Sequence, residues 1–275
     1  MSILPGIRHF AEHFSEFSKQ YVLIGGAACH VWYADEEPTF RATHDMDIVL
    51  ILEHLDDHFI HAFKQYLQEN GYQQWERHLI NQEDSHKKVM YRFIKPANSQ
   101  APAQMELLSR KGNIASLDKD CHTAPVKAGD VYTGLSCIVL DDSYYHFLVS
   151  QAHDKEKLSI LSIPALILLK IKAYLNLREQ YNPDKPHGSD GGKNNIRKHR
   201  NDVFFMLFSL AGDITCELPE ALMNDVQLFI DFIDTNETDW QGVLAHLKHQ
   251  YGEASLQGIS RTSMLARLKE VFQLP

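Results

Sequence analysis

Hydrophobic and polar positions follow strand-like and helix-like periods in turn over the first 160 residues of the chain. Short runs rich in β-branched and aromatic residues, such as YVLIGG and DMDIVLIL, are typical of strands. Apolar residues three or four positions apart are typical of amphipathic helices. The predicted helices of this part cover residues 7–20, 27–33 and 56–71, the last of them closed by Gly71. The predicted strands cover residues 21–26, 45–52, 72–80, 87–96, 103–110, 131–134 and 136–142. We interpret the aromatic-rich stretch at 143–151 as core packing.

From Ile163 onward the pattern is helical throughout. The predicted helices of this part cover residues 164–181, 194–211, 219–234, 240–251 and 263–272. A stretch rich in Gly, Pro and Asp at residues 182–193 predicts a mobile loop between the first two of them. We therefore expect two domains, an α/β domain at residues 1–160 and an all-helical domain at residues 161–275.

The net charge of −9 hides one basic region. Residues 170–200 contain eight basic and three acidic side chains, a local charge of +5, so the rest of the chain sums to −14. A single positive region on an acidic body suits an anionic ligand better than a long nucleic-acid track. The alternative is that these charges only solvate the outer faces of two helices.

The cysteines and the apolar runs indicate a cytoplasmic protein without a membrane anchor. The four cysteines have no Cys-x-x-Cys spacing and are too few for a disulfide scaffold in 275 residues. The charged N-terminal stretch does not resemble a signal peptide. The longest apolar run is interrupted by Lys170 and Lys172 and is shorter than the roughly 20 residues of a membrane span.

A glycine turn and a pair of aspartates lie within one strand–helix–strand unit. Backbone N–H groups at Gly25-Gly26, between a strand and a helix, can approach phosphate oxygens. Asp45 and Asp47 are two residues apart in a strand and share one face, where two carboxylates repel each other unless a cation lies between them. Taken singly, the glycines also fit a simple tight turn, and the aspartates also fit a solvated strand end, a calcium loop or a glycosyltransferase motif. In this order they indicate a nucleoside triphosphate site with Mg²⁺.

Glu106 is the candidate for a third metal ligand. Two-metal phosphoryl chemistry generally uses another acidic side chain from a neighbouring strand, and Glu106 lies in the otherwise apolar run QMELLS. The alternative is that Glu106 pairs with a lysine or faces water, because a buried carboxylate needs a partner.

The order Gly25-Gly26, then RATHDMD, then an acidic strand resembles the nucleotidyltransferase (polymerase beta-like) superfamily, and most closely its AbiEii-type toxin nucleotidyltransferases. RATHDMD fits the pattern Arg-x-Thr-x-Asp-x-Asp with Arg41 and Thr43. In that family a lysine-containing helix precedes a Lys-Asp-x-x-Asp motif. ALILLKIKAYLNLRE matches the helix through Lys170 and Arg178. KHRND, residues 198–202, matches the motif except that His199 replaces its first aspartate.

The resemblance implies an α/β, nucleotidyltransferase-like mixed sheet with flanking helices, followed by a helical part. It implies transfer of a nucleoside monophosphate from an NTP to an acceptor hydroxyl, with a tRNA 3′ end favoured and a protein hydroxyl second. The implied setting is the toxin of a type IV toxin–antitoxin or phage-defence system with a cognate antitoxin. The alternative is a catalytically silent module that holds a protein partner.

The resemblance also implies roles for individual residues. Implied ligands of Mg²⁺ or Mn²⁺ are Asp45, Asp47 and Glu106. Implied nucleotide contacts are Gly25, Gly26, Arg41, Thr43, Lys170 and Arg178. Implied further catalytic residues are Lys170, Lys198 and Asp202.

Helical spacing adds two expectations about the basic region. Lys170 shares a helix face with apolar residues and should be semi-buried, although its amine could still reach solvent. Asp202 follows Lys198 by four residues, so we expect it to hold Lys198 in place rather than to bind the acceptor.

Overall fold

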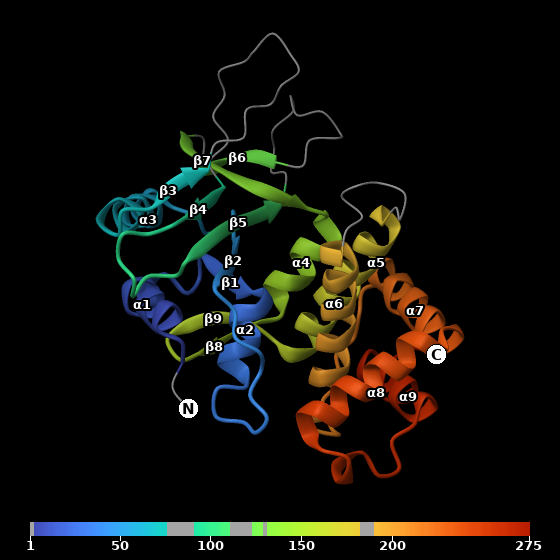
Figure 1. The fold of residues 1–275 in the computed structure, drawn as a ribbon. Helices are drawn as coiled ribbons and strands as arrows, with labels where there is room; N and C mark the ends of the chain where they lie inside the picture. Colours follow the sequence, from blue (N-terminus) through green and yellow to red (C-terminus); the bar gives the residue numbers. More distant parts are fainter. Residues whose placement is uncertain (1–2, 76–90, 111–122, 129–130, 182–189) are drawn as a thin grey trace. The chain divides into compact units, whose positions relative to one another are not determined.

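The computed structural model describes residues 3–75, 91–110, 123–128, 131–181 and 190–275. The chain divides into two compact units, Met1–Leu161 and Ser162–Pro275. We call the first the sheet unit and the second the helical unit (Figure 1). The predicted boundary, between residues 160 and 161, lies one residue from this division.

The described strands of the sheet unit form one mixed sheet, in the order β3-β4-β5-β2-β1-β9-β8, with β7 also paired to β5 and β6 paired to β7. The strands are β1 (Tyr21–Ile24), β2 (Asp45–Leu50), β3 (Gln73–Trp75), β4 (Arg92–Ile94), β5 (Gln104–Arg110), β6 (Thr123–Ala128), β7 (Val131–Leu140), β8 (Ala152–Lys155) and β9 (Leu158–Leu161). The prediction of an α/β fold with a mixed sheet is confirmed.

Three strands at the middle of this sheet set the register of the candidate site. The strand β2 runs antiparallel to β1 and parallel to β5. All four residues of β1 are buried, whereas β2 starts with exposed Asp45, then buried Met46 and half-buried Asp47. The polar face of β2 therefore lies at the start of the strand, and its last three residues are buried.

Aromatic side chains pack helices of the sheet unit against one another. The helical segments of the sheet unit are α1 (Pro5–Phe14), the 3₁₀ turn Ser15–Phe17, α2 (Gly25–Trp32), α3 (Asp57–Glu69) and α4 (Asp142–Ser150). Phe14 of α1 lies 5.8 Å from both Phe59 and Phe63 of α3, ring centroid to centroid. All three rings are buried, and such aromatic pairs add to the stability gained by burying their area.

The helical unit contains α5 (Ile163–Gln180), α6 (Asp190–Ser209), α7 (Glu220–Thr235), α8 (Glu237–Tyr251), a 3₁₀ turn (Ala254–Leu256) and α9 (Arg261–Val271). Side chains cap several of them: Ser162 accepts from the amide of Ala165 at the start of α5, and Ser260 forms a capping box with Ser263 at the start of α9. Such caps satisfy amides that have no partner within the helix.

Several predicted elements differ from the structure. The predicted strands 131–134 and 136–142 are one strand, β7. The predicted loop 182–193 lies partly outside the described residues, and its end from Asp190 already belongs to α6. Of the predicted strand 72–80, residues 73–75 form β3, and residues 76–80 lie outside the described residues. Of the predicted strand 87–96, residues 92–94 form β4, and residues 87–90 lie outside the described residues.

The sequence pattern also failed to predict α4 and the β8–β9 hairpin. Residues 143–151 are buried in part, as predicted, but as a helix that Asp141 caps by accepting from the amides of Ser143 and Tyr144. The hairpin turns on Glu156 and Lys157, whose φ values of 53° and 63° are in the left-handed region. Such turns usually carry Asn-Gly or Asp-Gly, so Glu-Lys gave no sequence signal. Among the described residues, no helix is long and apolar enough to cross a membrane.

Candidate functional site

A row of three charged side chains crosses the sheet near the starts of β2 and β5. Asp47 of β2 and Glu106 of β5 are Cα partners, and Arg92 of β4 is the Cα partner of Glu106 on its other side. Partners in register point to the same face of a sheet. The structure therefore brings Asp47, Glu106 and Arg92 together from three strands, and Asp45 lies on the same face of β2.

Glu106 is held by two neighbours. Its Oε1 atom lies 2.5 Å from Nε of Arg92 and accepts a hydrogen bond of 3.0 Å from Nε2 of Gln104. The Glu106 side chain is 14% exposed and that of Arg92 is 35% exposed, so solvent reaches the pair. Of the two alternatives weighed for Glu106, pairing with a basic side chain is the one observed, although the partner is an arginine and not a lysine.

The two glycines at the start of α2 contact the acidic motif. Gly25 has a φ of +66°, and a Cβ atom there would overlap Oδ2 of Asp47. A Cβ atom on Gly26 would lie 2.9 Å from Oγ1 of Thr43. Gly25 is therefore required both by its backbone conformation and by the close approach of a carboxylate. The glycine turn and the RATHDMD stretch, separate in sequence, therefore lie against each other in the structure.

Three other residues of RATHDMD, Arg41, Thr43 and Asp45, make contacts of their own. Thr43 donates a hydrogen bond of 3.4 Å from Oγ1 to the carbonyl oxygen of Asp45, which tethers the start of β2. Asp45 is exposed and is the Cα partner of Gln104. The guanidinium of Arg41 lies 5.2 Å from the ring centroid of Phe40, a cation–π distance.

The donor set of this site fits Mg²⁺ or Mn²⁺. The side chains offer carboxylate oxygens, which Mg²⁺ prefers, and the missing Cβ of Gly25 leaves the space in which the Asp47 carboxylate lies. In the described part of the chain, no three His, Cys, Asp or Glu side chains already converge as metal ligands. Glu106 would have to turn from Arg92 to share a cation with Asp47.

In the helical unit, Lys170 of α5 forms a buried ion pair. Its Nζ atom lies 3.0 Å from Oδ2 of Asp202 on α6, and the two side chains are 7% and 5% exposed. Lys170 is thus more deeply buried than the semi-buried position predicted. The Asp202 carboxylate thus pairs with a lysine of a neighbouring helix, an ion pair that depends on helix packing and that the i,i+4 argument did not predict. That Asp202 also holds Lys198, four residues earlier on α6, stays a prediction. Lys198 is exposed on α6.

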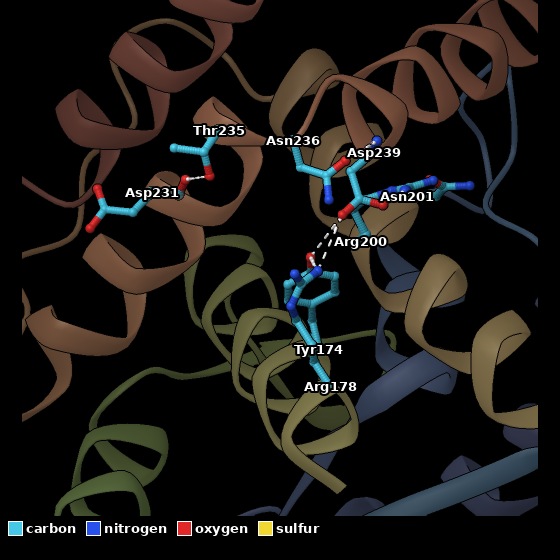
Figure 2. A network of polar contacts seen from close by, with 8 residues as sticks. All are labelled: Tyr174, Arg178, Arg200, Asn201, Asp231, Thr235, Asn236 and Asp239. Atoms are coloured by element: carbon cyan, nitrogen blue, oxygen red, sulfur yellow. Dashed lines mark hydrogen bonds and ion pairs between the residues drawn. The ribbon is translucent and has the colours of Figure 1, made fainter. Parts of the chain in front are cut away.

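Arg178, the other basic residue proposed from α5, belongs to a network of polar contacts within the helical unit (Figure 2). Its Nη1 atom donates to Oη of Tyr174 at 3.0 Å and lies 3.4 Å from Oδ2 of Asp239. The guanidinium also lies 4.4 Å from the ring centroid of Phe232. Burial raises the pKa of the Tyr174 hydroxyl, and the nearby Asp239 carboxylate raises it further.

Arg200 completes this network. Its Nη1 atom lies 2.5 Å from Oδ1 of Asp239, and its Nη2 atom donates to Oδ1 of Asn201 at 3.0 Å. Asp239 lies in the first turn of α8, which Asn236 caps by accepting from the amide of Asp239. A Cβ atom on Gly242 would lie 2.6 Å from Nη2 of Arg200. The network thus joins α5, α6 and α8 around one carboxylate.

Sequence reasoning missed Arg92, Arg200, Asp239 and a histidine pair on α1. Local sequence gave no signal for the first three, because their partners come from other strands and helices. The pair did have a signal, His9-x-x-Glu-His13, which matches a zinc-binding spacing. The two rings lie 4.5 Å apart, and Nδ1 of His9 lies 2.9 Å from Oη of Tyr66.

The contacts of His9 are structural. Its Nε2 atom lies 3.3 Å from Nδ2 of Asn98, and Asn98 donates in turn to Asn70. Burial lowers the pKa of His9, and the neighbouring His13 lowers it further against an opposing effect of Glu12. Both ring nitrogens of His9 therefore serve to join α1 to α3 and to the segment before β5.

Comparisons with known proteins add no relative to this picture. The chain matches no protein-family model, no curated protein and no solved structure. A function for the chain must therefore rest on the motifs and on the geometry of the sheet unit described above.

Proposed function

We propose that this protein is a metal-dependent nucleotidyltransferase that moves a nucleoside monophosphate from an NTP to an acceptor hydroxyl and releases pyrophosphate. The observation that carries the proposal is the contact of Gly25 with the Asp47 carboxylate, one strand away from Glu106 in register. A simple tight turn would account for the glycine through its φ of +66°, but not for a carboxylate packed against it. A phosphate-approaching turn beside metal-binding carboxylates would account for both.

The residues proposed for the chemistry lie in the sheet unit. Asp45, Asp47 and Glu106 would hold Mg²⁺ or Mn²⁺, which when bound neutralises the phosphates and activates the acceptor oxygen. The acceptor oxygen would bond to the α-phosphorus as the bond to the pyrophosphate oxygen breaks, and the acceptor proton would pass to a carboxylate or to water. Gly25 and Gly26 would present backbone amides to the phosphates, and Thr43 lies against Gly26. The resemblance adds Arg41 as a further nucleotide contact.

For Lys170, Lys198 and Arg178 of the helical unit, the resemblance implies the neutralisation of phosphate charge, because phosphoryl transfer depends mainly on positioning and charge neutralisation. Lys198 is exposed, so a phosphate in solvent can reach its amine. Lys170 is paired with Asp202, so Asp202 would orient it. Arg178 would have to leave Asp239 or contact the nucleotide through its 36% exposed side chain.

The acceptor in this proposal is a tRNA 3′ end, with a protein hydroxyl second. The setting is the toxin of a type IV toxin–antitoxin or phage-defence system, neutralised by a cognate antitoxin. Both rest on the likeness of the motifs to the AbiEii-type family. No contact among the described residues bears on either of them.

A second function is favoured by one observation, the ion pair of Glu106 with Arg92. A guanidinium that already neutralises the third carboxylate suits a silent, nucleotidyltransferase-like module that holds a protein partner. The two functions differ in whether the site can exchange that guanidinium for a cation.

The test is Mg²⁺-dependent release of pyrophosphate from the four NTPs, with pooled tRNA and then with protein acceptors. We expect Asp47→Asn to lower the rate by about 10³-fold or more, because losing several kcal/mol of charge stabilisation costs a factor of ten for each 1.4 kcal/mol. The matched control is Asp154→Asn, an exposed strand aspartate of β8, which should keep the wild-type rate. Equal turnover by wild type and Asp47→Asn would refute the metal site, and no release by wild type would favour the silent module.

A further inference from the structure

A pocket of about 210 Å³ opens beside Asp45 in the sheet unit. Three segments line it: the start of α1, the residues that lead into β2, and the segment before β5. Their lining residues include Ile7, Thr43, Asp45, Met46, Pro102 and Ala103. The pocket therefore adjoins the proposed site, because Thr43 and Asp45 belong to both.

The walls of this pocket are fixed by packing. A Cβ atom on Gly6 would lie 2.9 Å from Cα of Pro102, so α1 packs closely on the segment before β5. The carbonyl oxygen of Pro102 accepts a hydrogen bond of 2.6 Å from Oη of Tyr72. The carbonyl oxygen of Ala103 accepts from the amide of Lys95 at 3.2 Å. A preformed pocket binds without the cost of ordering its walls.

The chemistry of the lining selects an uncharged group. None of the described residues that line the pocket is Lys or Arg, and Asp45 is one of them, so the pocket disfavours phosphate. Prolines, alanines, Ile7 and Met46 give it apolar walls, with Thr43, His44 and Ser99 as polar groups. Sites for drug-sized ligands measure roughly 300–1,000 Å³, so this smaller pocket fits about one ring system.

We infer that the pocket binds a nucleobase of the substrate whose phosphates lie at Asp45 and Asp47. This inference rests on the proposed function. A flat, neutral ring with polar edges matches apolar walls that carry a few hydrogen-bonding groups, and a base is the part of a nucleotide without charge. The base can belong to the NTP or to a nucleic-acid acceptor, and both would place a phosphodiester or phosphate group near the carboxylates.

The experiment fills the pocket and measures binding with Mg²⁺. Ala103→Leu adds an apolar side chain at an exposed lining position, and Ser99→Leu does the same from a second exposed position in case Ala103→Leu fails to fold. The control is Ala245→Leu at an exposed position of α8. The probes are each of the four NTPs, inorganic tripolyphosphate, a short single-stranded RNA, and an abasic oligomer of the same length.

If the pocket binds the NTP base, filling it should weaken NTP binding about tenfold or more while tripolyphosphate binds as before, since a stacked base contributes strongly to affinity. If the pocket binds an acceptor base, filling it should weaken the binding of RNA more than that of the abasic oligomer, while NTP binding stays unchanged. The inference is overturned if the binding of NTPs and RNA is unchanged, or if tripolyphosphate loses as much affinity as the NTPs. Neither result would overturn the proposed function. If wild type binds neither tripolyphosphate nor NTP with Mg²⁺, the proposed function fails, and the inference fails with it.

Discussion

The sheet unit and the helical unit each place a glycine against a charged side chain, and the surroundings of that charge differ. In the sheet unit, Gly25 contacts half-buried Asp47 beside exposed Asp45. In the helical unit, Gly242 contacts Arg200, which is 4% exposed and paired with Asp239. Two acidic side chains of β2 thus share a face that solvent reaches, whereas the buried Arg200 guanidinium is neutralised by a paired carboxylate.

This difference separates two uses of charge. Buried pairs such as Lys170–Asp202 stabilise one arrangement of helices, because removing either partner removes the opposite charge from a group that is shielded from solvent. Carboxylates that share one face of a solvent-reached sheet gain from a cation instead. We therefore expect changes in the helical unit to alter stability first, and changes in the sheet unit to alter ligand binding first.

The largest stability effect should follow from breaking the buried pair. Lys170→Met keeps the side-chain length but removes the amine that lies 3.0 Å from the buried Asp202 carboxylate, which should lower the free energy of unfolding by about 3–5 kcal/mol. Urea denaturation, followed by the fluorescence of buried Trp240 in α8, measures this. The control is Lys172→Met on the same helix, whose pair with Asp225 is half-exposed and should contribute less than about 1 kcal/mol. Equal, small losses of unfolding free energy in both variants would contradict the view that buried charge pairs of the helical unit serve stability.

The two glycines allow the comparison to be made with one kind of substitution. Gly242→Ala gains about 1 kcal/mol of helix propensity, but its methyl group would overlap a buried guanidinium, at a cost of about 1–3 kcal/mol. We expect a net loss of stability with activity retained. Gly25→Ala should instead lose most activity, because its backbone is left-handed and its methyl group would displace the Asp47 carboxylate.

Gly212→Ala serves as the control for both variants, because a Cβ atom there would meet nothing within 4 Å. It should match wild type in activity and in the urea midpoint. If Gly25→Ala kept full activity, the close approach of Asp47 would have no functional meaning.

A smaller effect, on the affinity for Mg²⁺, is expected from replacing Arg92, because its guanidinium would compete with a cation for Glu106. Arg92→Gln removes the positive charge and should tighten Mg²⁺ binding several-fold, since an opposite charge nearby no longer occupies the carboxylate. Isothermal titration with Mg²⁺ measures this. Arg110→Gln is the control, because Arg110 lies at the other end of β5 and pairs with Glu53. Weaker Mg²⁺ binding in Arg92→Gln would show that Arg92 supports the metal site instead of competing with it.

The smallest effect concerns pH and the contacts of His9. Because burial and His13 lower the His9 pKa in the folded state, the unfolded chain binds its proton more tightly. Stability from this residue is therefore complete above the unfolded pKa of about 6.5 and decreases as pH falls below it. Thermal melts between pH 7.5 and 5 should show a smaller acid loss in His9→Asn than in wild type. His61→Asn, at an exposed position of α3, should keep the wild-type slope, and an equal slope in all three proteins would exclude His9 as the cause.

Local sequence was sufficient for the order of most elements. The run at Tyr21, the alternation at Asp45 and the helical period from Ile163 each depend on residues a few positions apart, and each predicted the element that formed. The α4 helix and the β8–β9 hairpin escaped because their signals are short or unusual, the latter a turn on Glu156-Lys157.

Sequence alone was also enough to show that Asp45 and Asp47 share a face, because side chains alternate along any strand. Which side chains meet them depends on the assembled sheet: β5 aligns Glu106 with Asp47, and β4 aligns Arg92 with Glu106. Helix packing likewise brings Asp202 to Lys170 of another helix. Strand register and helix packing depend on the burial of the whole core, which no short stretch of sequence specifies.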